Sequence, residues 1–364
     1  MEAKSITLIG LALSGGGAEL SMLRLAENFQ ARGFDVRVAV LKKRGRLVEH
    51  LPPKLPVDEI GGGRLSCIPR LASYLRRHRP DAIISFMTYT NVVAIAAQAL
   101  SLSAKRVVVS EHNTYSKSIR RSGILRLIYQ AAPYVYRWSR KVICVSHGVE
   151  DDLVETTTLP RRYLTTVYNP VITDELLAAS AAPPRHEWLT SKACPVILAV
   201  GRLEPQKNYP MLLRAVAIVR KKRECRLIIL GEGPLRDELQ CEIEKLGLQD
   251  CVDLHGFAPD AMSYMRTADL FVLASSWEGL SNVLIEAMAV GCPVVSTDAP
   301  HGPREVLRDG EFGRLVPVDD AGALAEAIET TLADPGDAAS RTAWARSFSV
   351  DACAERYLEI AGLC

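Results

Sequence analysis

Residues 275–286 read SSWEGLSNVLIE, and the elements on either side of this stretch decide the fold. An apolar run of strand length, residues 270–274, leads into it, and an apolar run of helical length, residues 283–290, leads out of it. That helix is expected to end at Gly291, before a second short strand at residues 294–296. The order strand, loop, helix, strand indicates an open α/β sheet, whose ligands bind at the carboxyl ends of its strands.

Two carboxylates stand in this stretch, Glu278 in the loop and Glu286 early in the helix. Apolar residues surround Glu286, so we expect a buried carboxylate that has hydrogen-bond partners. The alternative is a side chain that reaches out to solvent. Ser281 or Asn282 is expected to cap the start of the helix, where free N–H groups can bind an anion.

The segment from Trp277 to Glu286 resembles the Glu-x7-Glu signature of glycosyltransferase family 4, retaining enzymes that use nucleotide-sugars. The resemblance implies the GT-B fold, an α/β architecture with two Rossmann-like domains facing across a cleft. It implies that Glu278 lies by the donor sugar and that Glu286 binds the ribose hydroxyls, since a carboxylate accepts strong hydrogen bonds from vicinal hydroxyls. The residues between them would complete the nucleotide-sugar site: Gly279, Leu280, Ser281 and Asn282.

A second segment, GRLEPQKN at residues 201–208, follows an expected strand and resembles the family's Gly-Arg-x5-Lys motif. Arg202 and Lys207 can neutralise a diphosphate, the guanidinium by a planar fork and the ammonium as a point charge. They would also stabilise the charge that develops on the leaving nucleoside diphosphate. Judged without the resemblance, two solvated surface cations are the alternative. By the same resemblance, Gly231 and Phe257, at the ends of two further expected strands, lie near the base.

The first half opens in the Rossmann order of strand, glycine loop, helix and strand, at residues 6–13, 14–17, 19–32 and 36–41. The dinucleotide fingerprint Gly-x-Gly-x-x-Gly fails, because Leu20 stands in place of its third glycine. The second strand ends in Lys42-Lys43-Arg44, and such cations suit a 2′-phosphate. An NADP-dependent oxidoreductase is therefore an open alternative.

Gly16 and Gly17 resemble the family's N-terminal Gly-Gly loop, which lies under the donor phosphate and the acceptor. Glycine is expected there because a side chain would block the approach of a ligand to the backbone. A tight turn without a ligand is the alternative. His112 follows a strand expected at residues 106–110. A lone histidine is more often structural, but the family carries one in the same place, which implies that His112 lies at the sugar.

Residues 116–141 are rich in cations interleaved with aliphatic and aromatic side chains; the cations are Lys117, Arg120, Arg121, Arg126, Arg137, Arg140 and Lys141. A basic amphipathic helix can lie on an anionic membrane surface, and an ordinary surface helix is the alternative. Residues 1–180 hold 25 Lys and Arg against 15 Asp and Glu, whereas residues 181–364 hold 19 against 27. This asymmetry suggests an anionic partner for the first half. No nucleic-acid-binding motif accompanies it, so we expect no nucleic acid.

The 364 residues, 48% hydrophobic and 24% charged, suit a globular protein of two domains. We expect an acceptor-binding domain at residues 1–170, a connector at 171–193 and a donor-binding domain at 194–348, with a final helix at 349–364 packing back on the first domain. The longest apolar stretch, residues 92–104, is too short to cross a bilayer. Nine scattered cysteines argue for reduced thiols, so we expect a cytoplasmic protein, bound at most to the inner face of the cytoplasmic membrane.

Together these features predict a retaining hexosyl- or N-acetylhexosaminyltransferase. The chain has no Asp-x-Asp metal motif, so cations and a helix dipole would replace a metal, and we expect neither metal nor cofactor. The family's habits imply a UDP-sugar donor, and the basic first half suggests a lipid-linked oligosaccharide or lipopolysaccharide as the acceptor. The alternatives are a UDP-sugar 2-epimerase of the same fold, the NADP-dependent oxidoreductase, and a nucleotide-binding protein without turnover.

Overall fold

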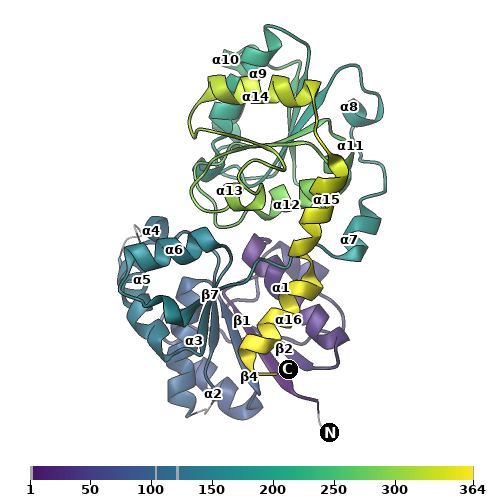
Figure 1. Ribbon diagram of the computed structural model, residues 1–364. Coiled ribbons are helices and arrows are strands. Elements are labelled where there is room, and N and C mark those ends of the chain that lie inside the picture. Colours follow the sequence, from purple (N-terminus) through teal and green to yellow (C-terminus); the bar gives the residue numbers. More distant parts are fainter. Residues whose placement is uncertain (1–2, 103–104, 120–122, 364) are drawn as a thin grey trace. The chain divides into compact units, whose positions relative to one another are not determined.

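The computed structural model describes residues 3–102, 105–119 and 123–363, and the chain divides into two compact units (Figure 1). Unit 1 is Met1–Pro170 together with Val350–Cys364. Unit 2 is Val171–Ser349. The first unit is therefore discontinuous in sequence, and the second is inserted into it.

In the described part of unit 1, parallel strands form one sheet in the order β3-β2-β1-β4-β5-β6-β7. The strands are β1 Ser5–Gly10, β2 Asp35–Val40, β3 Val57–Glu59, β4 Ala82–Phe86, β5 Val108–Glu111, β6 Lys141–Cys144 and β7 Leu164–Thr166. The helices are α1 Gly17–Ala31, α2 Cys67–His78, α3 Thr88–Ser101, α4 Tyr115–Ser118, α5 Ile124–Val135, α6 His147–Thr156 and α16 Val350–Ala361. Three 3-10 turns complete the unit: η1 Arg46–His50, η2 Tyr136–Trp138 and η3 Arg161–Tyr163.

The sheet of unit 2 is also parallel, in the order β10-β9-β8-β11-β12-β13. Its strands are β8 Val196–Val200, β9 Arg226–Leu230, β10 Val252–Gly256, β11 Leu270–Leu273, β12 Val294–Thr297 and β13 Arg314–Val316. Its helices are α7 Asp174–Ala179, α8 Glu187–Thr190, α9 Tyr209–Arg220, α10 Arg236–Lys245, α11 Ala261–Thr267, α12 Asn282–Ala289, α13 Pro303–Val306, α14 Ala321–Ala333 and α15 Ala338–Ala345, with 3-10 turns η4 Pro205–Lys207 and η5 Arg346–Phe348.

Both sheets follow the doubly wound order, in which the strand order reverses beside the first strand of the unit. The reversal lies between β1 and β4 in unit 1 and between β8 and β11 in unit 2. This order confirms the expectation of two Rossmann-like domains. It also fixes where each unit offers a crevice, because ligands of such sheets bind outside the carboxyl ends of the strands at the reversal.

Burial on both faces explains the sequences of the central strands, which are mostly apolar and do not alternate between apolar and polar residues. β8 (VILAV) and β9 (RLIIL) coincide with the strands expected from the sequence, and their aliphatic side chains lie in the core of unit 2. The short strands β3 and β13 escape detection from the sequence, because three residues are too few to show a pattern.

The last helix, α16, packs beside α1 in unit 1 (Figure 1). Its Tyr357 and Leu358 are buried in the core of that unit. At the surface, Asn28 Nδ2 of α1 donates a hydrogen bond to Asp351 Oδ1 at 2.7 Å. The apolar face of α16 therefore completes the core that residues 1–170 begin.

Two expectations need correction. The connector expected at residues 171–193 is part of unit 2, where it forms α7 and α8. The basic stretch at residues 116–141 is not one helix, because Gly123, with a φ of +63°, separates α4 from α5, and β6 begins before the stretch ends. Two of its cations, Arg120 and Arg121, lie outside the described residues.

Within the described ranges, none of the helices combines the length and the apolar character needed to cross a membrane. The cysteines of the same ranges are all free thiols.

Candidate functional site

An ion pair lies where the sheet of unit 2 reverses its order. Lys207, in the loop after β8, places its Nζ 2.6 Å from Oε1 of Glu278, in the loop after β11. Ser275 Oγ donates to the same oxygen at 2.6 Å. The two charged side chains are 17% and 8% exposed, respectively. A largely buried ion pair seldom adds net stability over apolar packing, so these two side chains are candidates for a binding role.

The backbone of these loops is fixed by close approaches. Gln206 Nε2 donates to the carbonyl of Trp277 at 2.8 Å, which joins the two loops. Gly231, after β9, has a φ of +144°, and a Cβ at that position would lie 2.0 Å from the carbonyl oxygen of Gly201. Only glycine fits there, for both reasons. The loops after β8, β9 and β11 are thus joined into one rim of the sheet.

The start of α12 differs from the expected cap. Ser281 occupies the N-cap position, but its φ is +75° and its side chain makes no capping hydrogen bond. Its Oγ is buried without a protein partner, and its carbonyl instead accepts from the N–H of Leu284. A neighbouring loop packs closely on this turn, since a Cβ on Gly302 would lie 2.7 Å from Leu280 Cα. A strained residue with an orphaned hydroxyl is a feature of ligand sites.

Glu286 lies in α12 and is half-buried, so the expectation of a buried carboxylate is wrong. The helix is not apolar all round, and one side reaches the surface. Gly279 is likewise half-buried, whereas Leu280 is buried.

Two predicted site residues lie at the surface of unit 2. Arg202 has a side chain that is 71% exposed, and its guanidinium pairs with Glu204 at 2.5 Å. Phe257, just after β10, is 59% exposed. In this conformation the guanidinium of Arg202 is not part of the Lys207–Glu278 pair, and Glu204 is a neighbour that no sequence motif marks.

The glycine loop of unit 1 is organised by a glutamate. Glu19 Oε2 accepts from the N–H of Gly15 at 2.7 Å and of Gly16 at 3.1 Å, and α1 begins at the next residue, Gly17. Gly15 has a φ of +99°, which favours glycine. A Cβ on Gly16 would meet no atom nearer than 3.9 Å. Packing within the protein therefore leaves room above Gly16, as a ligand-binding loop requires.

His112 follows β5 in unit 1 and is 8% exposed. Its Nε2 lies 3.0 Å from Ser110 Oγ, and its Nδ1 is buried without a protein partner. Burial lowers the pKa of His112 to about 3, so the imidazole is neutral near pH 7. A neutral imidazole with an open nitrogen can accept or donate one hydrogen bond to a hydroxyl.

The residue before it, Glu111, was not singled out from the sequence as a site residue. Its carboxyl is buried, and burial raises its pKa to about 7, against hydrogen bonds that lower it. The hydrogen-bond partners of Glu111 come from distant parts of the chain, so no local spacing in the sequence indicates that these side chains meet.

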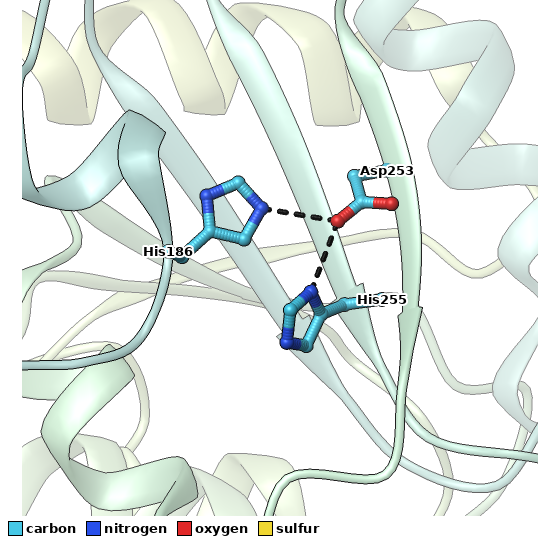
Figure 2. Close-up of side chains that lie close together, drawn as sticks. All are labelled: His186, Asp253 and His255. Carbon is cyan, nitrogen blue, oxygen red and sulfur yellow. Dashed lines mark hydrogen bonds and ion pairs between the residues drawn. The ribbon is translucent and has the colours of Figure 1, made fainter.

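One group of side chains has the composition of a metal site. In the described residues, His186, Asp253 and His255 are the three that could share an ion (Figure 2). The two imidazoles flank Asp253 Oδ2, with His186 Nε2 at 3.0 Å and His255 Nδ1 at 3.1 Å. The other nitrogens are also bonded: His186 Nδ1 accepts from the N–H of Trp188 at 3.1 Å, and His255 Nε2 lies 3.1 Å from the hydroxyl of Tyr264.

The bond from Trp188 fixes the tautomer of His186. Because Nδ1 accepts, the proton of the neutral ring is on Nε2, which donates it to Asp253. A metal at Nε2 would shift that proton to Nδ1, where it would meet the N–H of Trp188. The cluster is therefore best explained as a hydrogen-bonded latch between the start of α8 and β10.

Two family models match the chain, one for each half. The model described as "Glycosyltransferase Family 4" matches residues 15–175. The model described as "Glycosyl transferases group 1" matches residues 185–347. Together they span both units.

Two curated relatives illustrate the match. The chain is 34% identical over 255 residues to the N-acetylgalactosamine-N,N'-diacetylbacillosaminyl-diphospho-undecaprenol 4-alpha-N-acetylgalactosaminyltransferase of Campylobacter jejuni, covering 70% of this chain and 67% of that protein. It is 30% identical over 340 residues to the phosphatidyl-myo-inositol mannosyltransferase of Mycobacterium leprae, covering 87% of this chain and 84% of that one.

Among solved structures, HepE of Anabaena in complex with UDP-glucose superimposes with a TM-score of 0.83. The match covers 99% of this chain and all of that one, at 21% identity. At this level of identity the likeness is one of fold.

Proposed function

Because this chain belongs to glycosyltransferase family 4 and has the GT-B fold, we propose that it is a retaining enzyme that moves a hexose or N-acetylhexosamine from a UDP-sugar to a glycan acceptor. The observation that carries the proposal is the Lys207–Glu278 ion pair at the strand reversal of unit 2. An ammonium held by a single carboxylate keeps further N–H groups for a diphosphate, and it does so beside the start of α12.

In this proposal the donor binds along the rim of unit 2. Lys207 and the backbone N–H groups from Gly279 to Asn282, in the turn that leads into α12, hold the diphosphate and stabilise its charge as the sugar leaves. Arg202 joins them by exchanging Glu204 for a phosphate oxygen. The half-buried Glu286 accepts from the ribose hydroxyls, and Gly231 and Phe257 lie near the base. No metal takes part, since the cations and the helix dipole supply the positive charge.

In unit 1, the neutral imidazole of His112 offers its Nδ1, which has no protein partner, to a sugar hydroxyl. The acceptor hydroxyl enters over the loop from Gly15 to Gly17, where a Cβ on Gly15 or Gly16 would meet no atom nearer than 3.9 Å. Glu278, paired with Lys207, lies by the donor sugar.

For the acceptor we propose a glycan on a lipid carrier or a lipopolysaccharide. The names of the two relatives above include a diphospho-undecaprenol and a phosphatidyl-myo-inositol, both of which are lipids. Unit 1 also carries most of the exposed large apolar side chains of the described residues; they are Leu11, Leu65, Leu100, Leu102, Leu127, Tyr134 and Trp138, whereas Phe257 belongs to unit 2.

Helix α5 and the turn after it present an apolar stripe to solvent. Leu127 is 66% exposed, Tyr134 60% and Trp138 67%, and their spacing places them on one side of the helix. Arg126 and Arg137 are exposed beside them. Aromatic side chains with flanking cations suit the interface of an anionic membrane, so we propose that this stripe binds the membrane that carries the acceptor.

The donor site is tested by calorimetric titration with UDP, GDP, ADP and NADPH, each with and without EDTA. We expect UDP to bind in EDTA and Lys207→Ala to weaken it about 10- to 100-fold, because hydrogen bonds to charged groups contribute about 1.5–3 kcal/mol. Lys222→Ala, at a lysine that is 66% exposed in the same unit, is the matched control and should bind UDP as the wild type does.

Turnover of UDP-glucose and UDP-N-acetylglucosamine separates the remaining alternatives. A transferase releases UDP in step with a glycosylated acceptor, whereas a 2-epimerase releases an altered sugar without any acceptor. A binding protein consumes neither. Binding of NADPH in place of UDP would sink the proposal and turn attention to the glycine loop of unit 1.

The membrane stripe is tested by sedimentation with vesicles of anionic phospholipid at low salt. We expect Leu127→Asp to lower the partition coefficient about tenfold or more, because burying a leucine side chain contributes about 1.5–3 kcal/mol. Gln249→Asp is the control, since it adds the same charge at an exposed position of unit 2. Equal binding by both variants, or none by the wild type, contradicts the proposal.

A further inference from the structure

The buried carboxylate of Glu111 joins three elements of unit 1. It ends β5, and it is 1% exposed. Thr88 Oγ1 donates to it at 2.8 Å and Asn91 Nδ2 at 3.0 Å, both from the first turn of α3. Thr88 bonds Oε2 of the carboxylate, and Asn91 bonds Oε1. The hydroxyl of Tyr136, the first residue of η2, also donates to Oε1. The end of β5, the start of α3 and the segment after α5 thus meet at one carboxylate.

His112 is fixed from the opposite face of the same strand end, because successive side chains of an extended strand alternate. Its Nε2 bonds Ser110 Oγ, which lies 2.9 Å from the hydroxyl of Tyr357 on α16. The ring of Phe86 packs against the imidazole, with centroids 5.6 Å apart. The position of His112 therefore depends on the contacts on both faces of the end of β5. Ser110 makes contacts on one face, and Glu111 makes contacts on the other.

A carboxylate is a costly choice for this position. The hydrogen-bond donors around it are neutral, and a buried charge without a cation pays a large desolvation cost that an apolar side chain would avoid. What favours the ionised form is geometry: three donors converge on it, and two of them stand at the positive end of α3.

The other titratable groups that face Glu111 stay neutral near pH 7. They are Tyr115 of α4, Tyr136 of η2 and Cys144 of β6, and burial and the charge of Glu111 raise the pKa of each. His112 is neutral for the opposite reason, since burial lowers its pKa. Near neutral pH, Glu111 is thus the member of this cluster whose charge changes.

We propose that Glu111 is a positioning residue for His112: its ionised carboxylate holds α3 and η2 against the end of β5 and so sets where the imidazole lies. The inference rests on the proposed role of His112 at the sugar. An ionised carboxylate accepts from all three donors, whereas a carboxylic acid carries a proton on one oxygen and must turn it toward one of them. Protonation therefore breaks or reverses one bond, and the strand end moves with it.

The direct test follows the imidazole of His112 by NMR in protein labelled with 15N at histidine, with His112→Gln to assign the signal. In the wild type we expect the signal to shift with pH around a midpoint of about 7, the pKa of Glu111, although His112 itself stays neutral there. Glu111→Gln should abolish that transition. Tyr136→Phe removes one donor to the carboxylate, so the midpoint should move upward, and Tyr163→Phe, elsewhere in unit 1, should leave it unchanged.

The same variants are assayed with UDP-glucose. We expect kcat of Glu111→Gln to fall about 10- to 100-fold at an unchanged KM for UDP-glucose, because a misplaced group costs rate more than binding. A wild-type His112 signal without a transition, or one that persists in Glu111→Gln, overturns the inference. Should Glu111→Gln fail to fold, an unmoved midpoint in Tyr136→Phe overturns it.

Failure of the proposed function gives a different result. In that case the wild type would turn over no nucleotide-sugar, while the transition of the His112 signal and its loss in Glu111→Gln would remain.

Discussion

The carboxylate of Glu278 lies between an ammonium and a hydroxyl in surroundings that exclude most water. Removing one partner of such a pair leaves the other charge uncompensated, which costs about 3–5 kcal/mol. Lys207→Ala is therefore expected to be less stable as well as weaker in UDP binding. Its binding should be compared with the wild type at a temperature where both are folded.

The neutral state of His112 predicts a pH dependence of stability. The folded protein holds its pKa at about 3, below the ordinary value of 6.5, so the unfolded chain binds the proton more readily. The contribution of the neutral His112 to the free energy of unfolding is complete above about pH 6.5 and is lost as the pH falls toward 3. For each pH unit below 6.5, the wild type should lose up to about 1.4 kcal/mol that His112→Gln does not lose.

Urea unfolding of both proteins between pH 5 and pH 7.5 checks this expectation. Glu111 acts in the opposite direction, since its raised pKa makes the protein less stable as the pH rises toward 7, but it is present in both proteins and cancels in the difference. His50→Gln, at an exposed histidine, is the control. Parallel curves for the wild type and His112→Gln would show that the imidazole can be protonated in the folded state.

At the scale of elements, the latch of His186, Asp253 and His255 ties the start of α8 to the edge strand β10. His186→Ala removes the cap of α8 and one donor to Asp253, and it should lower the free energy of unfolding by about 1–2 kcal/mol. Thermal unfolding measures the change, with His50→Ala as the control.

The same proteins test the tautomer of His186. We expect Zn²⁺ to leave the midpoint of the wild type unchanged, because a metal at Nε2 would cost the hydrogen bond from Trp188. A rise in the midpoint with Zn²⁺ that disappears in His186→Ala would instead make the cluster a metal site.

Helices and strands were predictable from the sequence wherever a buried element produces a run of apolar residues, as in β8 and β9. The sign of φ at a turn residue was not predictable. Ser281 has the right chemistry for a cap, but it lies in a turn against which Gly302 packs closely, its φ is +75° and its hydroxyl makes no capping hydrogen bond.

The candidate site shows the same limit. Glu278 and Lys207 were found because each stands in a motif, and their contact then follows from the strand order. Glu111 and the latch residue His186 were missed because their partners are distant in sequence and differ in type, so that only the folded chain brings them together.

At the scale of the whole molecule, unit 1 depends on a helix that the chain delivers after unit 2. Leu358 of α16 is 3% exposed, and Leu358→Ala should cost about 2–5 kcal/mol. The loss should be local to unit 1. Amide hydrogen exchange should quicken in β1 and β4 of that unit and stay slow in β8 and β9.

Leu213→Ala is the matched control, because that leucine is fully buried in the core of unit 2. It should give the converse pattern of exchange. If Leu358→Ala quickens exchange equally in both units, the two do not open independently.

The discontinuity of unit 1 also matters on the ribosome. Pro170 and Val350 are separated by the whole of unit 2, and at about 5–20 residues per second its synthesis takes roughly 10–40 s. For that time the nascent first unit lacks α16, so the core side chains that pack against this helix stay uncovered, while the insert that follows can already fold. Translation thus completes the second unit before the first. Until α16 is synthesised, the first unit is the part of the chain that is exposed to aggregation.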